Sequence, residues 1–283
     1  VDVLPTPEQA PLLKWVQGHS AGVEHLVDHP LASKAQFTNA SGIHTPAIGE
    51  YVMMMILAFS HHLPQFISYQ ANAEWPSGRW DKFVPHELRG ATMGIVGYGS
   101  LGREIARLAR AFGMTVLATK REVRHLADDG WRLNGTGDAR AQAVRRLYPP
   151  QALKSMLREC DYIVLTVPLT PNTQQLIGAA ELEAMKPGAF LVNVSRGRVV
   201  DERALAKALR DGGLGGAALD VFETEPLPQD SPLWSMPNVI LSPHVSGFTP
   251  HYDKRALAVF EDNLRRYLDG KPLLNLVDMQ RGY

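Results

Sequence analysis

Three polar residues of complementary chemistry, Arg196, Glu225 and His244, each come just after a short apolar segment in the second half of the chain. A histidine exchanges protons near neutral pH, a carboxylate beside it can orient the imidazole, and the planar guanidinium of an arginine binds carboxylates through two hydrogen bonds. Taken singly, His244 could be a structural histidine, and Arg196 and Glu225 could form a structural ion pair. Together they are candidates for one functional site.

A glycine-rich loop with the pattern Gly97-x-Gly99-x-x-Gly102 is a second candidate site. It follows an apolar segment and opens a helical pattern, which is the context that a dinucleotide-binding loop needs. Gly97 permits a tight turn, Gly99 lets the backbone approach a pyrophosphate, and Gly102 permits close packing of helix on strand. The amides of Ser100 and Leu101, at the start of the helix, would donate to the phosphates. A glycine turn without a ligand is the alternative.

The residues after the next apolar segment bear on which dinucleotide binds. An NAD site usually has Asp or Glu there, about 20 residues beyond the loop, to bind the ribose 2′-hydroxyl. Here Lys120 and Arg121 take that place, with Arg124 and His125 close behind. Because cations favour a 2′-phosphate, the sequence predicts NADP as the cofactor, with NAD as the second possibility. A solvated basic turn is the alternative.

These motifs fall within a regular alternation of apolar segments and helical patterns. The apolar segments are short and uninterrupted, which is typical of parallel strands covered on both faces. Helices are predicted between them, over 100–112 and 201–210 among others. The chain is therefore predicted to have an α/β fold with a doubly wound parallel (Rossmann) sheet. The expected strands are 93–96, 115–118, 162–167, 189–194, 217–221 and 239–241.

The predicted sheet brings the candidate residues together. Ligands of open parallel sheets bind outside the carboxyl ends of the strands. Arg196, Glu225 and His244 follow three of these ends, and the glycine loop follows another. We therefore expect all of them to face one crevice.

The two ends of the chain differ in pattern from the middle. A long buried helix is expected over 46–60, and an amphipathic helix over 251–269. We expect the two ends to meet in a second, smaller domain that binds the substrate, with the dinucleotide-binding domain inserted between them. The segment 75–89, rich in tryptophan, proline and charge, would connect the two. The expected parts are 1–74 and 249–283 for the smaller domain, and 75–248 for the dinucleotide-binding domain.

The composition is that of an ordinary globular protein. The 283 residues are 45% hydrophobic and 20% charged, and Lys plus Arg equals Asp plus Glu at 29 each, so no basic surplus points to nucleic acid. No apolar run reaches the ~18 residues of a membrane span. The single cysteine, Cys160, cannot form an internal disulfide, which suits a reducing compartment and predicts a cytoplasmic protein. The adjacent His61 and His62 face different ways on a helix, so we expect no metal site.

Five segments resemble motifs of the D-isomer-specific 2-hydroxyacid dehydrogenases. They come in the order and spacing of that family, so together they are highly specific, and the resemblance covers nearly the whole chain. The segments are TVPLTPNT at 166–173, MKPG at 185–188, NVSRGRVVD at 193–201, LDVFETEP at 219–226 and SPHVSG at 242–247.

The resemblance implies a role for each polar residue in the reduction of a 2-keto acid. His244 would protonate the carbonyl oxygen as hydride arrives, with Glu225 as its partner, and Arg196 would polarise the carbonyl and grip the carboxylate. The backbone amides of Ala21 and Gly22 match a turn that holds the substrate carboxylate, although an ordinary turn is the alternative. Further residues implied to bind the cofactor are Thr166, Pro168, Thr173, Val194, Ser195, Gly247 and, on the nicotinamide carboxamide, Asp220.

The substrate implied by the resemblance is a small 2-keto or 2-hydroxy acid such as glyoxylate or hydroxypyruvate. A second possibility keeps the site but oxidises another small oxyanion, such as phosphite, which some relatives use. A third is a non-enzymatic protein that senses nicotinamide through the same fold. The resemblance also implies a homodimer built around the nucleotide domain, with Trp75, Trp80 and Phe83 in a candidate contact arm.

The chain departs from the family pattern in two places. Relatives usually begin with a further strand–helix–strand portion before the match to 12–15, so the smaller domain, which is flavodoxin-like, is expected to be N-terminally incomplete. The stretch 121–149 is longer than the short strand–helix connection that is usual in the family, and we expect a long loop there. Because it begins beside the expected 2′-phosphate pocket, the hypothesis is that it covers the adenosine end of the cofactor.

Overall fold

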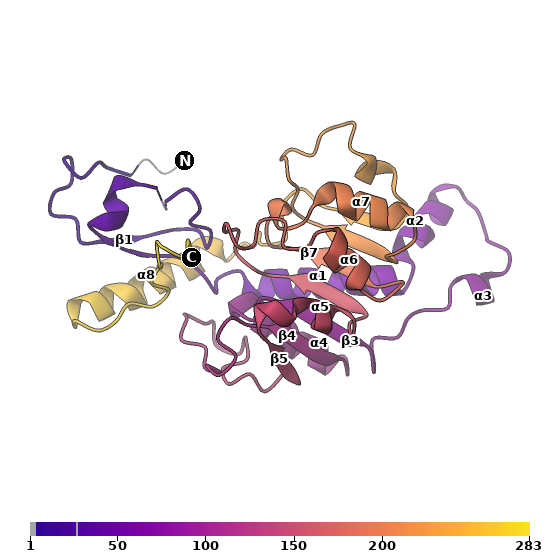
Figure 1. The fold of residues 1–283 in the computed structure, drawn as a ribbon, viewed down its shortest axis with the longest axis horizontal. Coiled ribbons are helices and arrows are strands. Elements are labelled where there is room, and N and C mark those ends of the chain that lie inside the picture. Colours follow the sequence, from indigo (N-terminus) through magenta and orange to yellow (C-terminus); the bar gives the residue numbers. More distant parts are fainter. Residues whose placement is uncertain (1–3, 27) are drawn as a thin grey trace.

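A seven-stranded parallel sheet forms the centre of the computed structural model, which describes residues 4–26 and 28–283 (Figure 1). From one edge to the other, the strands are β5 (Arg146–Tyr148), β4 (Thr115–Thr119), β3 (Thr92–Val96), β6 (Tyr162–Leu165), β7 (Phe190–Asn193), β8 (Gly216–Leu219) and β9 (Val239–Leu241). The chain runs outward from β3 in both directions, which is the doubly wound arrangement. That topology opens a crevice at the carboxyl edge of the sheet, between β3 and β6.

Helices cover both faces of this sheet (Figure 1). On one face lie α1 (Thr45–Ser60) and α4 (Ser100–Ala111), and on the other lie α5 (Leu153–Leu157), α6 (Ala179–Ala184) and α7 (Glu202–Arg210). Because both faces are covered, β6 and β7 are buried at every position. Double coverage is the reason that these strands are continuous apolar segments. The fold class predicted from the sequence is confirmed.

All six predicted strands are present, with small shifts at their ends, but β5 was not predicted. Its three residues include Arg146 and have no continuous apolar run, so no strand pattern marks them. β5 pairs with β4 at the edge of the sheet, and Tyr148 is buried there while Arg146 is exposed. A strand with one neighbour needs fewer apolar residues than one in the middle.

Residues 121–145 contain no helix or strand, so most of the stretch 121–149 is the long loop that the sequence analysis expected. It ends in β5, and its earlier part is held against α4 by the buried side chains of Arg103 and Glu104. The Arg103 guanidinium donates to the carbonyl oxygens of Leu126 and Ala127 at 2.9 and 3.0 Å, and the Gly137 N–H donates to Glu104 Oε2 at 2.6 Å. These side chains satisfy backbone groups that a solvated loop would expose to water.

Trp131 connects the same stretch to residues from both ends of the chain. Its side chain is 7% exposed and packs with Ala40, Ile43 and Val259. Its indole N–H donates to Asp262 Oδ2 at 3.0 Å. The stretch therefore joins the helix that follows the glycine loop to the smaller unit of the molecule.

Segments from both ends of the chain form this smaller unit (Figure 1). β1 (Trp15–Gln17) and β2 (Gln36–Thr38) make a two-stranded parallel sheet, and α8 (Tyr252–Leu268) lies beside it. The Trp15 ring stacks on the rings of Phe260 and Tyr267, both on α8, at centroid distances of 5.6 and 5.5 Å. The precise domain boundaries stay a prediction.

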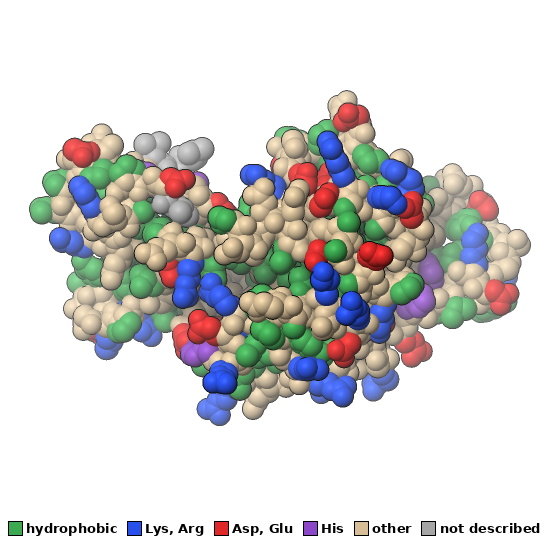
Figure 2. All heavy atoms as spheres, in the orientation of Figure 1, with side chains coloured by type: hydrophobic (Ala, Val, Ile, Leu, Met, Phe, Trp, Pro, Cys, Tyr) green, Lys and Arg blue, Asp and Glu red, His purple; other side chains and the backbone are tan. Residues whose placement is uncertain are grey.

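The segment between α1 and β3 projects from the rest of the molecule (Figures 1 and 2). It contains α2 (Leu63–Ala71) and α3 (Arg79–Lys82), and the side chains of Trp75 and Trp80 are 82% and 79% exposed. Short 3-10 turns complete the described elements: η1 (Pro30–Ser33), η2 (Pro150–Ala152), η3 (Gly197–Val199) and η4 (Pro232–Ser235). Over residues 4–26 and 28–283, no helix has the length and apolar character needed to cross a membrane.

Candidate active site

The glycine loop has the conformation that phosphate binding needs. Gly97 has a φ of 108°, a value that favours glycine, and a Cβ on Gly102 would lie 2.3 Å from the Gly97 carbonyl oxygen. A Cβ on Gly99 would meet no atom within 4 Å, so the loop is open on that side. Among the described residues, the N–H groups of Gly99, Ser100 and Leu101 have no acceptor. Open donors at the start of a helix fit an anion such as a pyrophosphate.

Two threonines that hold the loop come from neighbouring strands. Thr119, at the end of β4, accepts a hydrogen bond from the Gly97 N–H at 3.1 Å, and Thr166, after β6, donates to the Gly97 carbonyl oxygen at 2.7 Å. The sequence analysis assigned Thr166 to the cofactor and did not single out Thr119. Nearby, Thr173 donates to the Pro168 carbonyl oxygen at 2.6 Å and shapes the loop 166–173. Cofactor contacts by Thr166, Pro168 and Thr173 stay a prediction.

The basic residues expected at the 2′-phosphate lie at the carboxyl end of β4. The Lys120 ammonium donates to the His125 carbonyl oxygen, and burial lowers the pKa of Lys120, with the charge of Arg103 acting in the same direction. The Arg121 guanidinium lies 4.8 Å from the centroid of the Tyr283 ring. Lys120 and Arg121 follow the strand that lies next to the glycine-loop strand, so the place is right for the adenosine end of a dinucleotide.

The predicted acid–base pair is formed. Glu225 follows β8, His244 follows β9, and these strands are neighbours in the sheet. His244 Nδ1 lies 2.8 Å from Glu225 Oε2, and Glu225 Oε1 accepts from the Phe222 N–H at 3.0 Å. A carboxylate only accepts hydrogen bonds, so Nδ1 carries the proton and Nε2 is the atom left for a substrate. The two side chains are 49% and 36% exposed, as a site that meets a ligand requires.

Asp220 holds His244 in place. Its fully buried carboxylate accepts from the Ser242 hydroxyl at 2.6 Å and from the Val245 and Ser246 amides, each at 2.9 Å, and its carbonyl oxygen accepts from the His244 N–H at 2.8 Å. These bonds support His244 at a φ of 54°, which is uncommon outside glycine. Asp220 is thus a positioning residue, and its predicted contact with the nicotinamide carboxamide stays a prediction.

A tyrosine from α1 extends this hydrogen-bond network and was missed by the sequence analysis. Tyr51 Oη lies 2.5 Å from Ser242 Oγ. Since the Ser242 proton goes to Asp220, the Tyr51 hydroxyl is the donor in this bond. Burial raises the pKa of Tyr51 to about 12, so this hydroxyl keeps its proton. No local pattern singles out Tyr51, because its partner lies far along the chain.

The third residue, Arg196, lies on the loop after β7. Ser195 beside it is tied to Asn193 Oδ1 through both its N–H and its hydroxyl, at 3.0 and 2.7 Å. A Cβ on Gly197 would stand 1.8 Å from the Phe222 carbonyl carbon, so this loop touches the loop that leads to Glu225. Arg196 and the acid–base pair are therefore carried by adjacent loops. The predicted cofactor contacts of Ser195 and of Val194, which is buried, stay a prediction.

The turn expected to hold a substrate carboxylate lies against Arg196. A Cβ on Gly22 would stand 2.2 Å from an Arg196 terminal nitrogen. Asn39 Nδ2 donates to the Ala21 carbonyl oxygen at 3.1 Å, whereas the Ala21 and Gly22 N–H groups have no acceptor within 4–26 and 28–283. Arg196 Nε also lies 2.9 Å from Glu24 Oε1, an ion pair that the sequence analysis missed.

His44 closes the side of the site next to Gly247. Its Nδ1 lies 3.1 Å from the Gly247 carbonyl oxygen and is the donor, because a carbonyl only accepts. Burial lowers the pKa of His44; the bond to Gly247 opposes this, and the charge of Arg196 adds to it. His44 is therefore a neutral group near the acid site, and the predicted cofactor contact of Gly247 stays a prediction.

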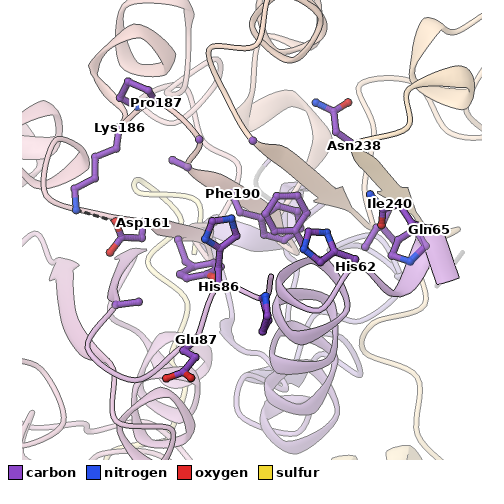
Figure 3. A pocket seen from close by; sticks show the side chains of 18 of the residues that line it. His62, Gln65, His86, Glu87, Asp161, Lys186, Pro187, Phe190, Asn238 and Ile240 are labelled. Carbon is purple, nitrogen blue, oxygen red and sulfur yellow. Dashed lines mark hydrogen bonds and ion pairs between the residues drawn. The ribbon is translucent and has the colours of Figure 1, made fainter. Parts of the chain in front are cut away.

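A cavity of about 760 Å³ lies elsewhere. Phe190 and Ile240, near the amino ends of β7 and β9, line it together with His62 and His86, and the Asp161–Lys186 ion pair of 2.8 Å closes one side (Figure 3). Ligands of open parallel sheets bind at the opposite, carboxyl edge, so this cavity is not the active site. Throughout the described part of the chain, no group of three or more His, Cys, Asp or Glu could hold a metal ion.

Comparisons with known proteins agree with this geometry. The family model described as "D-isomer specific 2-hydroxyacid dehydrogenase, NAD binding domain" matches residues 53–246. A glyoxylate reductase of Thermococcus gammatolerans is 36% identical over 86% of this chain and 69% of its own length. An (S)-sulfolactate dehydrogenase of Chromohalobacter salexigens is 37% identical over 91% and 78%.

Solved structures with a similar fold belong to the same group of enzymes. A D-isomer specific 2-hydroxyacid dehydrogenase from Xanthobacter autotrophicus Py2, in complex with NADPH and MES, has a TM-score of 0.83 and 32% identity over 98% of this chain and 81% of its own. The NADPH-dependent glyoxylate/hydroxypyruvate reductase of Sinorhizobium meliloti has a TM-score of 0.81 and 30% identity over 98% and 82%. The chain therefore belongs to the D-isomer specific 2-hydroxyacid dehydrogenases and is an NAD(P)-dependent oxidoreductase.

Proposed function

We propose that this protein is an NADPH-dependent reductase of small 2-keto acids, with glyoxylate and hydroxypyruvate as its candidate substrates. The observation that carries the proposal is the His244–Glu225 pair, 2.8 Å from Nδ1 to Oε2, on loops adjacent to that of Arg196. A proton donor next to a carboxylate-binding cation is what reduction of a 2-keto acid requires. The glyoxylate reductases among the relatives support the choice of substrate.

The residues that would hold the cofactor fit a phosphorylated dinucleotide. The amides of Gly99, Ser100 and Leu101 are available for the pyrophosphate, and Lys120 and Arg121 supply positive charge for a 2′-phosphate. Two similar structures, from Xanthobacter autotrophicus Py2 and Rhizobium etli, are complexes with NADPH and NADP, which supports NADP over NAD. When bound, NADPH supplies the hydride that the carbonyl carbon of the substrate receives.

The residues of the chain would supply the proton and hold the acid. His244 donates a proton from Nε2 to the carbonyl oxygen, while its Nδ1–H bond to Glu225 fixes the ring and stabilises the charged imidazole before transfer. Arg196 binds the carboxylate and polarises the carbonyl. The N–H groups of Ala21 and Gly22 bind the other side of the carboxylate.

The test is consumption of reduced cofactor, followed by absorbance, with a panel of 2-keto acids and either NADPH or NADH. We expect turnover of glyoxylate and hydroxypyruvate, with the higher kcat/KM for NADPH. His244→Ala should abolish turnover and leave NADPH binding intact. Consumption with none of the acids would refute the proposal and favour the nicotinamide-sensing protein, and phosphite-dependent reduction of NADP would favour the oxyanion oxidase.

We also propose a homodimer and a cytoplasmic location. The exposed Trp75 and Trp80 on the projecting segment support a contact between copies, since large exposed apolar side chains mark interaction surfaces. The buried single cysteine, Cys160, supports a reducing compartment. Light scattering should give twice the mass of one chain, and Trp80→Asp should shift the protein toward monomer. A monomeric wild-type protein would contradict the dimer.

A further inference from the structure

The ion pair between Arg196 and Glu24 is a feature that hydride transfer alone does not require. Arg196 lies after β7 of the large sheet, and Glu24 lies in a turn of the smaller unit, between β1 and β2. Arg196 Nε and Glu24 Oε1 are 2.9 Å apart, and about a third of each side chain is exposed. A carboxylate of the chain itself thus occupies the guanidinium that a substrate carboxylate is expected to use.

The turn that carries Glu24 is held firmly in place. Val23 and Leu26, on either side of it, are 2% and 7% exposed and pack with Phe37 in the core of the smaller unit. Glu24 Oε2 lies 2.7 Å from the point where a Cβ on Gly22 would stand. The carboxylate therefore folds back over the turn whose amides lack acceptors, and it stands where the acid is expected to bind.

The charges of Arg196 and Glu24 balance one another. Arg196 contributes one positive charge and Glu24 one negative charge, and a second nitrogen of the guanidinium, Nη1, donates to the Ser195 carbonyl oxygen at 2.8 Å, which leaves Nη2 for a ligand. Burial lowers the pKa of the neighbouring His44, and the charge of Arg196 lowers it further, so both effects disfavour a positive charge on its ring. A monocarboxylate brings one negative charge to the pair, whereas an acid with a second anionic group brings two.

We propose that Glu24 is a specificity-determining residue, which admits 2-keto acids with one negative charge and disfavours those with a second anionic group near C3. The argument rests on the proposed function, because it takes Arg196 as the group that binds the substrate carboxylate. Like charges held a few ångströms apart repel strongly at a partly buried site. Such repulsion is a common way to reject a wrong substrate. Glu24 also competes with the substrate for Arg196.

The direct test is anion binding to the NADPH-loaded protein, followed by nicotinamide fluorescence. Oxamate serves as the singly charged probe, and tartronate, a dicarboxylate of similar size, as the doubly charged one. Glu24→Gln keeps the shape of the side chain and removes its charge. We expect the variant to bind oxamate about threefold more tightly, because Glu24 no longer competes for Arg196. Tartronate should bind about tenfold more tightly or better, because the repulsion of its second carboxylate is removed as well. Glu24→Asp, which keeps the charge but withdraws it, should fall between.

Glu8→Gln is the matched control, since Glu8 is an exposed glutamate of the same part of the chain. It should leave both dissociation constants unchanged. Equal shifts for the two anions, weaker binding by Glu24→Gln, or no binding of either anion would overturn the inference. Weaker oxamate binding in particular would mean that Glu24 orients Arg196 and does not compete for it. A thermal melt checks that each variant is folded.

Turnover separates this inference from the proposed function. In Glu24→Gln, the ratio of kcat/KM for hydroxypyruvate to that for oxaloacetate should fall about tenfold or more. If the wild type reduces hydroxypyruvate but the ratio does not change, the inference fails and the function stands. If no keto acid is reduced while the two anions respond as expected, the function fails and the assignment of Glu24 to anion selection stands.

Discussion

Replacing Gly197 with alanine should separate the two loops that carry Arg196 and Glu225. A Cβ at this position would stand 1.8 Å from the carbonyl carbon of Phe222 and 1.9 Å from its oxygen. Carbon atoms in contact are normally about 3.5 Å apart, so the loops would have to move by about 1.7 Å. Both sides of the contact are backbone, so no side-chain rotation can relieve it.

The size of the effect follows from that displacement. Misplacing a catalytic group by about 1 Å costs roughly 100-fold in rate, which corresponds to about 2.7 kcal/mol of transition-state stabilisation. Overpacking of this kind also destabilises a protein by about 1–3 kcal/mol. We therefore expect Gly197→Ala to lower kcat/KM at least 100-fold and to lower Tm. NADPH should still bind, since the glycine loop lies at another strand end, but more weakly because the predicted contact of Ser195 moves with the loop.

The assay combines kcat/KM for a 2-keto acid that the wild type reduces with Tm and the dissociation constant of NADPH. Gly213→Ala is the control, because its Cβ would meet only one atom, at an ordinary 3.4 Å, on the exposed turn after α7. That variant should match the wild type in all three measurements. A Gly197→Ala protein with kcat/KM within threefold of wild type and an unchanged Tm would refute the reasoning.

Three further predictions concern the cofactor, the connecting stretch and pH. Replacing Lys120 and Arg121 with alanine should raise KM for NADPH tenfold or more and leave KM for NADH nearly unchanged; equal changes in both would contradict the 2′-phosphate pocket. Trp131→Ala should cost about 3 kcal/mol or more in unfolding free energy, since the side chain is 7% exposed, whereas Trp234→Ala, at a residue 58% exposed, should cost much less. Burial raises the pKa of Asp138, but hydrogen bonds to the carboxylate outweigh burial and hold this pKa below its usual value. Asp138 therefore stabilises the fold above the unfolded-state pKa of about 4 and loses this contribution as pH falls, so the Tm difference between wild type and Asp138→Asn should be largest at neutral pH and shrink below about pH 4.

The features that sequence analysis predicted correctly depend on short, continuous segments. Each predicted strand is a local apolar run, and the glycine loop is a local pattern between a strand and a helix. A shared position for His244 and Glu225 was predicted because they follow strands of one parallel sheet, and the carboxyl ends of such strands share an edge. Their pairing, which the family resemblance implied, is present in the structure.

The features that it missed depend on contacts between distant residues. β5 has no apolar run of its own and is a strand because β4 offers it an edge to pair with. Residues 121–145 form the expected loop, but its hydrogen bonds to the Arg103 and Glu104 side chains on α4 were not predicted. The contacts of the Asp220 carboxylate with the segment that carries His244 were not predicted either. No local sequence pattern near any of these residues predicts which distant residue it contacts.

The sequence by itself determined that this protein has a Rossmann sheet, a dinucleotide loop and an arginine, a glutamate and a histidine at one edge of that sheet. Local apolar patterns and the geometry of parallel strands were sufficient for this. Only the tertiary structure decided that Tyr51 supports Asp220 through Ser242, and that Glu24 pairs with Arg196 across the two units. Those contacts exist because helix and sheet packing brings remote segments together, and no local pattern encodes that approach.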